Sequence, residues 1–126
     1  MSKKQSKKVK AGMKPEEIAI LHYELLMDDN KEEWLKTFRK FHQGQADRHG
    51  SSPDLYWRTV RRYVTELGYS YKFKNKDEKQ SDDRHVKLFF TRLNKEGKPQ
   101  GAGPVPIHLV KDPEDNDEWR VDVTTW

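Results

Sequence analysis

The sequence contains no cysteine, which excludes disulfide bonds, thiolate metal ligands and cysteine nucleophiles. It also lacks any run of the roughly 18 apolar residues that a membrane-spanning helix needs. The basic N-terminus is not followed by an apolar segment, so the pattern of a secretory signal is missing as well. These absences together predict a cytoplasmic protein.

Hydrophobic side chains are also scarce, since they make up 33% of the 126 residues while charged residues make up 37%. Two observations nevertheless argue against disorder: the net charge is only +4, and the chain has four Trp, five Tyr and five Phe. Each aromatic side chain buries a large area, so a small number of them can build a core. The length suits one domain.

The positive charge is concentrated at the N-terminus. Six lysines and no acids precede Pro15, which leaves 19 basic residues against 21 acids in the rest of the chain, a net charge of −2. We therefore interpret residues 1–13 as a flexible basic arm and residues 14–126 as a single α+β domain. The arm is expected to contact nucleic acid only non-specifically, through its charge.

Three stretches show the helical spacing of apolar residues: 15–28, 30–44 and 52–68. Pro15 suits the first turn of the first helix, Asn30 and Ser52 can cap the other two, and Gly68 is a natural stop. The third stretch has an apolar stripe that should be buried and arginines on its other face that should remain exposed. The stripe consists of Tyr56, Val60, Tyr63, Val64 and Leu67, and the arginines are Arg58, Arg61 and Arg62.

After Gly68 the period of the apolar residues changes from about 3.6 to 2, which predicts four strands. Their core-facing residues are Tyr69, Tyr71 and Phe73, then Val86, Leu88 and Phe90, then Val105, Ile107 and Leu109, and last Trp119, Val121 and Val123. The connections are too short for crossover helices, so we expect a meander. The sequence thus predicts the α+β class, with three N-terminal helices packed on a curved four-stranded antiparallel sheet.

The opposite face of this sheet mixes apolar and polar residues. Strand parity places there Lys72, Phe89, Leu93, His108, Val110, Arg120, Asp122, Thr124 and Trp126. This face is too apolar for ordinary surface, so we expect a homodimer that pairs through the sheet. The interface candidates are Phe89, Leu93, Val110 and Trp126. The alternative is that Trp126 frays in solvent or folds back over its own sheet.

The order of elements and two short segments resemble the nuclear transport factor 2-like (SnoaL-like) family, which has a cone-shaped α+β fold. The segments are Pro15-Glu16-Glu17-Ile18 and Glu118-Trp119-Arg120-Val121-Asp122-Val123. The resemblance covers about residues 14–126, and a cystatin-like arrangement is its near alternative. It implies a helix-lined cavity and dimerisation through the sheet. Some members are isomerases, dehydratases or cyclases, and many are non-catalytic binding modules; the catalytic Asp, Tyr and protonated Asp of the isomerases cannot be placed on this sequence.

Two histidines are candidate catalytic residues. His22 lies on the apolar stripe of the first helix, and His85 follows two acids that could raise its pKa, as a general base requires. A core histidine and a charged strand edge are the competing structural interpretations. The candidates for lining a ligand cavity are His22, Tyr23, Tyr56, Tyr63 and Tyr71. His42, Asp47 and His49 match no ligand spacing, so neither a metal nor a cofactor is expected.

We favour a non-catalytic domain that binds a small apolar or amphipathic ligand, or a protein partner. One alternative is an enzyme of the same fold that performs proton-transfer chemistry of the isomerase or dehydratase type in the cavity. The other is a nucleic-acid-associated protein that uses the lysine arm and the arginine-bearing helix. Fold alone does not assign function, so all three hypotheses depend on the site.

Overall fold

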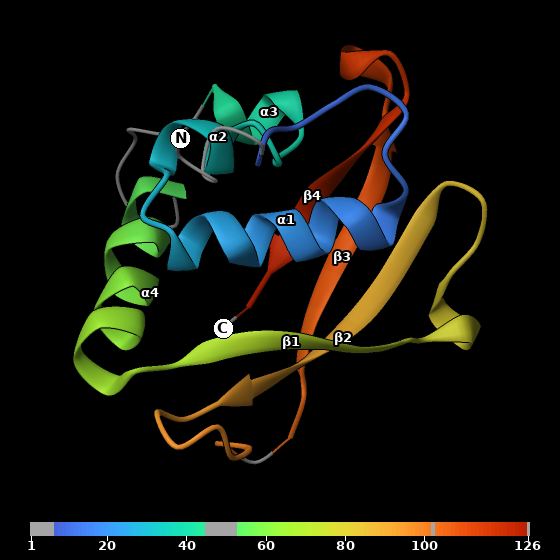
Figure 1. The fold of residues 1–126 in the computed structure, drawn as a ribbon. Helices are drawn as coiled ribbons and strands as arrows, with labels where there is room; N and C mark the ends of the chain where they lie inside the picture. The colour runs from blue at the N-terminus through green and yellow to red at the C-terminus, as the bar shows by residue number, and fades with distance from the viewer. Residues whose placement is uncertain (1–6, 45–52, 102, 126) are drawn as a thin grey trace.

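The computed structural model describes residues 7–44, 53–101 and 103–125. Within these ranges four α-helices precede a four-stranded antiparallel sheet, which confirms the predicted α+β class (Figure 1). The helices are α1 (Pro15–Met27), α2 (Lys31–Leu35), α3 (Lys40–Gln43) and α4 (Pro53–Leu67). The strands are β1 (Ser70–Lys76), β2 (His85–Leu93), β3 (Val105–Asp112) and β4 (Glu118–Thr124), and two 3-10 turns are η2 (Glu78–Gln80) and η3 (Pro113–Asp115).

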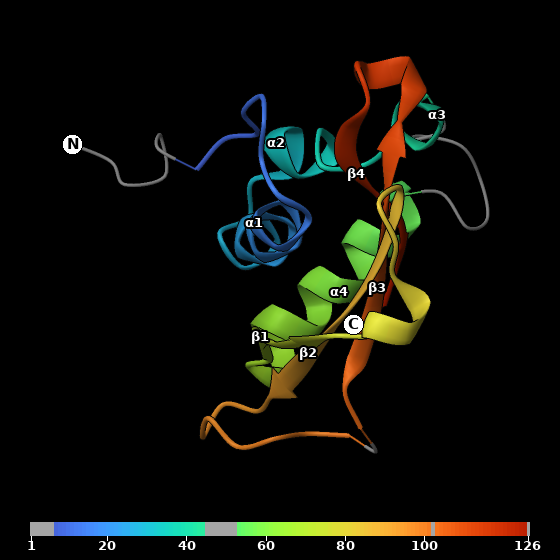
Figure 2. The same ribbon diagram turned by 90° about the vertical axis from the view of Figure 1, so that its right-hand side faces the viewer.

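Helix α1 lies across one face of the sheet and contacts all four strands (Figure 2). Pro15 occupies its first turn, and the Glu17 carboxylate accepts the backbone N–H of Lys14 at 2.8 Å. Ile18 and Leu25 are among the residues that this helix buries completely. The predicted helix 15–28 is therefore correct in position and in its buried side.

The second predicted helix, residues 30–44, is interrupted between α2 and α3. There the chain pairs in parallel with β4 through Phe38 and Val121. The Val121 N–H donates to the Thr37 carbonyl at 2.7 Å, and the Arg39 N–H donates to the Val121 carbonyl at 3.1 Å. A strand distant in sequence thus takes the backbone groups that a continuous helix would have used, and Phe38 becomes buried beside it.

Helix α4 forms the third predicted helix, but its buried side is turned toward Trp57. Val60 is fully buried and Trp57 is 8% exposed, whereas Leu67 of the predicted stripe is 47% exposed. The Trp57 ring lies against Trp34 of α2, with centroids 5.0 Å apart. The predicted cap Ser52 lies outside the described residues. Helix α4 packs against α1 and against Trp34 of α2, which explains the rotation.

Arg61 corrects the prediction that the arginines of α4 face solvent. Its Nη1 donates to the carbonyl oxygens of Leu26 and Met27, at 2.5 and 3.2 Å, where α1 ends. Asp29, which has a positive φ of 59°, lies 3.5 Å from the Arg61 Nε. A cation suits the negative end of a helix dipole, so α4 caps α1. The spacing within one helix cannot reveal this contact with another.

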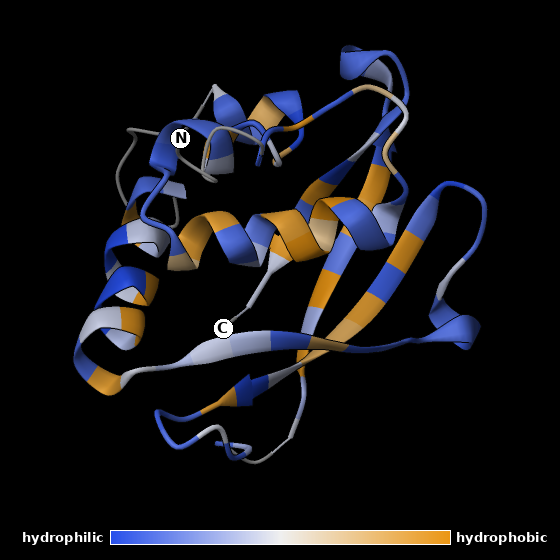
Figure 3. Cartoon of the chain, viewed as in Figure 1, coloured by the Kyte–Doolittle hydropathy of each residue, from blue (hydrophilic) through white to orange (hydrophobic). Residues whose placement is uncertain are grey.

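The sheet is the predicted meander, with order β1-β2-β3-β4 and antiparallel neighbours throughout. Figure 3 shows hydrophobic and hydrophilic residues alternating along β2. We call the face that carries the buried Val86, Leu88 and Phe90 the inner face, and the opposite one the outer face. Strand β1 contains a register shift between Phe73 and Asn75.

The last strand departs from the predicted alternation. Its register against β3 shifts after Val121, where Asp122 is an extra residue that forms a bulge. Val123 consequently lies on the outer face, 50% exposed, and Thr124 is buried on the inner face. The prediction that Val123 faces the helices and Thr124 faces outward is wrong, because a bulge reverses the side-chain alternation beyond it.

Candidate functional site

His22 is fully buried on the inner face. Its Nδ1 lies 2.8 Å from the Thr37 Oγ1, whose own proton goes to the Trp34 carbonyl at 2.6 Å. Nδ1 therefore carries the ring proton, and Nε2 accepts a hydrogen bond from the Thr124 hydroxyl at 3.2 Å. Burial lowers the pKa of His22 to about 3, so the ring is neutral at physiological pH. This imidazole therefore links α1 to Thr124 of β4 and to Thr37, which lies where the second predicted helix is interrupted.

Tyr23 and Tyr71, two candidates for a ligand cavity, pack ring against ring with centroids 4.9 Å apart. The Tyr23 ring also lies 4.4 Å from Phe90, and its hydroxyl donates to the Thr125 carbonyl at 2.7 Å. Burial raises the pKa of both phenols. The structure thus places these two rings in the packed core. The other two tyrosine candidates are half-buried on α4: Tyr56 and Tyr63.

His85 of β2 and His108 of β3 meet on the outer face. The Nε2 of His85 lies 3.1 Å from the Nδ1 of His108, and the ring planes are 17° apart. Only one proton fits between these facing nitrogens. Burial lowers the pKa of His108, and the positive charges of His85 and Lys87 lower it further, while Asp122 raises it. Among the described residues, the His85 ring faces His108 and not the expected carboxylate, and Asp82 accepts the His85 backbone N–H at 2.9 Å.

The bulge residue Asp122 gathers two basic side chains at the β4 edge of the outer face. Its Oδ1 lies 3.0 Å from the Arg39 Nη1 and 3.3 Å from the His42 Nε2. Within the described ranges, no group of three or more His, Asp or Glu side chains is arranged to hold a metal ion. Asp47 and His49, which the sequence places near His42, lie outside those ranges.

Strand register and burial place apolar side chains on the outer face of β2, β3 and β4. In the described part of the chain, no α-helix lies across that face (Figure 2). The half-buried residues there include Phe89, Val110 and Pro106, and Pro106 pairs with Phe89 across the strands. Val123 is the most exposed of the set, and the Lys87 ammonium lies 5.1 Å from the centre of the Phe89 ring. This arrangement places apolar and cationic groups side by side.

The sequence predicted two further interface residues, Leu93 and Trp126. Leu93, at the end of β2, is half-buried on the outer face, and Trp126 lies outside the described residues. Sequence reasoning missed Pro106 and Val123. The parity of β3 could have identified Pro106, but no local signal identifies Val123, because its position depends on the bulge at Asp122.

The arginines of α4 are neutralised locally. Arg58 pairs with Asp54 at 3.4 Å and Arg62 pairs with Glu66 at 3.3 Å, one helical turn away in each case. Arg61 is occupied at the end of α1. The positive patch that the sequence suggested is therefore weakened by acids on the same helix.

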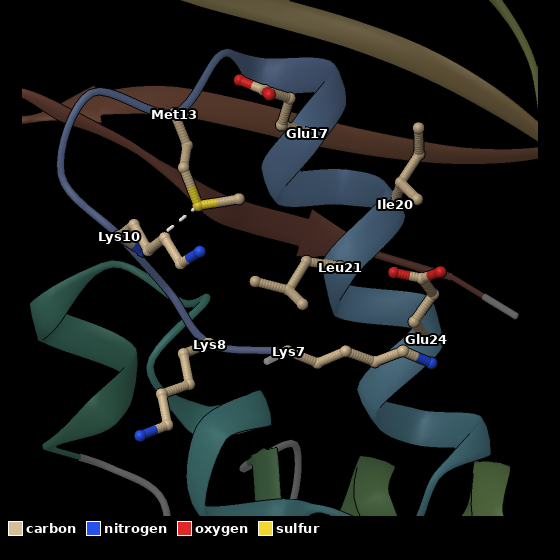
Figure 4. A pocket seen from close by; sticks show the side chains of 8 residues that line it. All are labelled: Lys7, Lys8, Lys10, Met13, Glu17, Ile20, Leu21 and Glu24. Atoms are coloured by element: carbon tan, nitrogen blue, oxygen red, sulfur yellow. Dashed lines mark hydrogen bonds between the residues drawn. The ribbon is translucent and has the colours of Figure 1, made fainter. Parts of the chain in front are cut away.

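Residues 7–13, which the sequence assigns to a flexible arm, lie against the domain. The Lys7 Nζ is 2.7 Å from the Asp28 carboxylate, and the Gly12 N–H donates to Glu118 at 3.0 Å. Val9 and Met13 pack against the core. This segment and α1 form the two sides of an open groove of about 360 Å³ (Figure 4).

Comparisons with protein-family models, with curated proteins and with solved structures found no match. The structure itself defines an α+β protein with an open antiparallel sheet, an arrangement compatible with a cone fold. None of the described helices has the length and hydropathy required to cross a membrane.

Proposed function

We propose that this chain is a non-catalytic binding module of the nuclear transport factor 2-like type, and that it pairs with a second copy through the outer face. The observation that carries the proposal is the apolar surface of that face. Val123 is 50% exposed there, beside the half-buried Phe89, Pro106 and Val110. A face of this composition loses unfavourable contact with water when it is covered.

The resemblance to the nuclear transport factor 2-like family, whose members commonly dimerise through the sheet, favours a second copy as the partner. In an isologous pair with its two-fold axis along the strands, β1 of one copy lies over β4 of the other, and β2 lies over β3. Phe89 of one copy then lies over Pro106 of the other, because these two residues are paired at the same level of β2 and β3.

The histidine geometry supports a binding role over proton-transfer chemistry. His22 is fully buried and uses both ring nitrogens in hydrogen bonds to threonine hydroxyls. The His85 ring faces His108 rather than a carboxylate. A general base needs a free nitrogen within reach of substrate, and His22 offers none. The acid-paired arginines of α4 likewise count against specific nucleic-acid binding.

The test compares two variants with matched exposure in light scattering or sedimentation at micromolar concentration. Val123→Glu changes a residue 50% exposed on the outer face, and Leu67→Glu changes one 47% exposed on α4. We expect the wild type and Leu67→Glu to be dimers and Val123→Glu to be a folded monomer by circular dichroism. A monomeric wild type, or a Val123→Glu protein that still dimerises, would contradict the proposal.

A further inference from the structure

The groove beside α1 is a built feature, because three contacts hold residues 7–13 in place along it. Lys7 pairs with Asp28, the Val9 N–H donates to Glu33 at 3.3 Å, and the Gly12 N–H donates to Glu118. These contacts reach α2 and β4 as well as the end of α1. The groove therefore has one wall from the N-terminal segment and the other from the helix.

The floor of the groove is apolar. Leu21 points into it from α1, and Met13 faces Leu21 from the other wall (Figure 4). The Lys10 N–H donates to the Met13 sulfur at 3.2 Å, which orients that side chain. Ile20, 37% exposed on α1, extends the apolar surface outward. An aliphatic chain is the ligand shape that such a strip accommodates.

The charged groups around this floor are three lysines and two acids, Glu17 and Glu24. The Glu17 carboxylate accepts the backbone N–H of Lys14. Lys7 itself pairs with Asp28.

Lys8 and Lys10 complete the lining, and neither ammonium forms an ion pair with any described residue. Figure 4 shows the Lys10 side chain reaching over the floor toward Leu21. A free ammonium beside an apolar strip matches a ligand that carries an anionic head on an aliphatic tail.

We propose that this groove binds an amphipathic anion, with its aliphatic tail on Met13, Ile20 and Leu21 and its head group at Lys10, assisted by Lys8. The site goes beyond the proposed self-association. It lies on α1 and the N-terminal segment, whereas the outer face lies on the other side of the sheet. Failure of one proposal therefore leaves the other intact.

The probe is decanoate, followed by amide chemical shifts in NMR titrations below its micelle concentration. We expect saturable binding with shifts centred on residues 7–13 and α1. Octanoate should bind about tenfold more weakly, because two methylenes are lost, and acetate should not bind. Decanol should bind severalfold more weakly than decanoate, since it has the tail without the charge.

Variants separate the head site from the tail site. Lys10→Gln should weaken decanoate severalfold and leave decanol unchanged, while Ile20→Gln should weaken both. Lys98→Gln changes an exposed lysine in the turn before β3 and should alter neither. Circular dichroism checks that each variant folds, and Ile20→Ala replaces Ile20→Gln if the latter does not.

Two outcomes would overturn the proposal. One is decanoate binding that Lys10→Gln and Ile20→Gln leave unchanged. The other is binding that disappears in Phe89→Glu, which would place the ligand on the outer face. The titration of Phe89→Glu also distinguishes the two proposals, because this variant should lose self-association and keep the groove.

Discussion

The two faces of the sheet use histidine in opposite ways. On the inner face His22 is fully buried, and burial alone lowers its pKa. On the outer face His85 and His108 are partly exposed, and the pKa of His108 depends on Lys87 and Asp122 as well as on burial. A proton therefore reaches His22 mainly through unfolding, whereas His108 can titrate in the folded protein. Protonation of His22 is thus coupled to stability, and protonation of His108 is coupled to the charges of the outer face.

The largest expected difference between the faces comes from two adjacent residues of β2. Leu88 is fully buried and Phe89 is half-buried on the outer face. Leu88→Asp should lower the free energy of unfolding by more than about 4 kcal/mol, because it buries an unpaired carboxylate, while Phe89→Asp should cost about 1 kcal/mol. Urea unfolding measures both changes. Equal losses would mean that the two faces are not distinct environments.

Acid should destabilise the protein through His22. The unfolded chain protonates this ring near its ordinary pKa of 6.5, while the folded protein keeps it neutral down to about 3. The unfolded state thus binds a proton that the folded state does not. The free energy of unfolding should therefore fall as pH drops from 6.5 to about 3, by about 1.4 kcal/mol per pH unit.

Urea unfolding at several pH values tests this contribution. His22→Gln should be less stable at neutral pH and should show a flatter pH dependence than the wild type. Lys98→Gln, which changes an exposed lysine in the turn before β3, is the control and should keep the wild-type slope. Parallel slopes for the wild type and His22→Gln would contradict the assignment.

A smaller effect distinguishes two neighbouring arginines of α4. Arg61 donates to two carbonyl groups at the end of α1, and Arg62 is 75% exposed beside Glu66. Arg61→Ala should lower the unfolding free energy by about 1–2 kcal/mol. Arg62→Ala should stay within about 0.5 kcal/mol of the wild type. Thermal unfolding of both variants decides whether the contact between α4 and α1 contributes to stability.

The smallest effects concern the outer pair and are best seen by NMR titration of the His108 ring. His85→Gln and Lys87→Gln should each raise the pKa of His108 toward its ordinary value, since both residues lower it. Asp122→Asn should lower that pKa, because the carboxylate raises it. Shifts in the same direction for all three variants would contradict the electrostatic account of this face.

Local signals predicted most of the fold. The proline at the start of α1, the glycine after α4 and the change of period at β1 each act on neighbouring residues, so the sequence reveals them directly. The meander followed because its connections are short. These features can be predicted without knowing which elements pack against one another.

The errors arise where distant segments meet. Thr37 and Arg39 leave the helix because they pair with Val121, and Val123 changes face because the same strand has a bulge at Asp122. The groove was missed for a similar reason. Residues 7–13 contain few apolar side chains, and their contacts with Asp28, Glu33 and Glu118 cannot be read from spacing along the chain.

The pairing of residues 37–39 with β4 also bears on aggregation. It occupies the N–H and carbonyl groups of Val121, which an incoming strand from another molecule would need. At the opposite edge, β1 bears exposed charge at Lys72 and Lys74 and is bent by its register shift. Copies of the chain are therefore hindered from joining into one continuous sheet. Concentrated solutions should resist fibril growth even though the outer face is apolar.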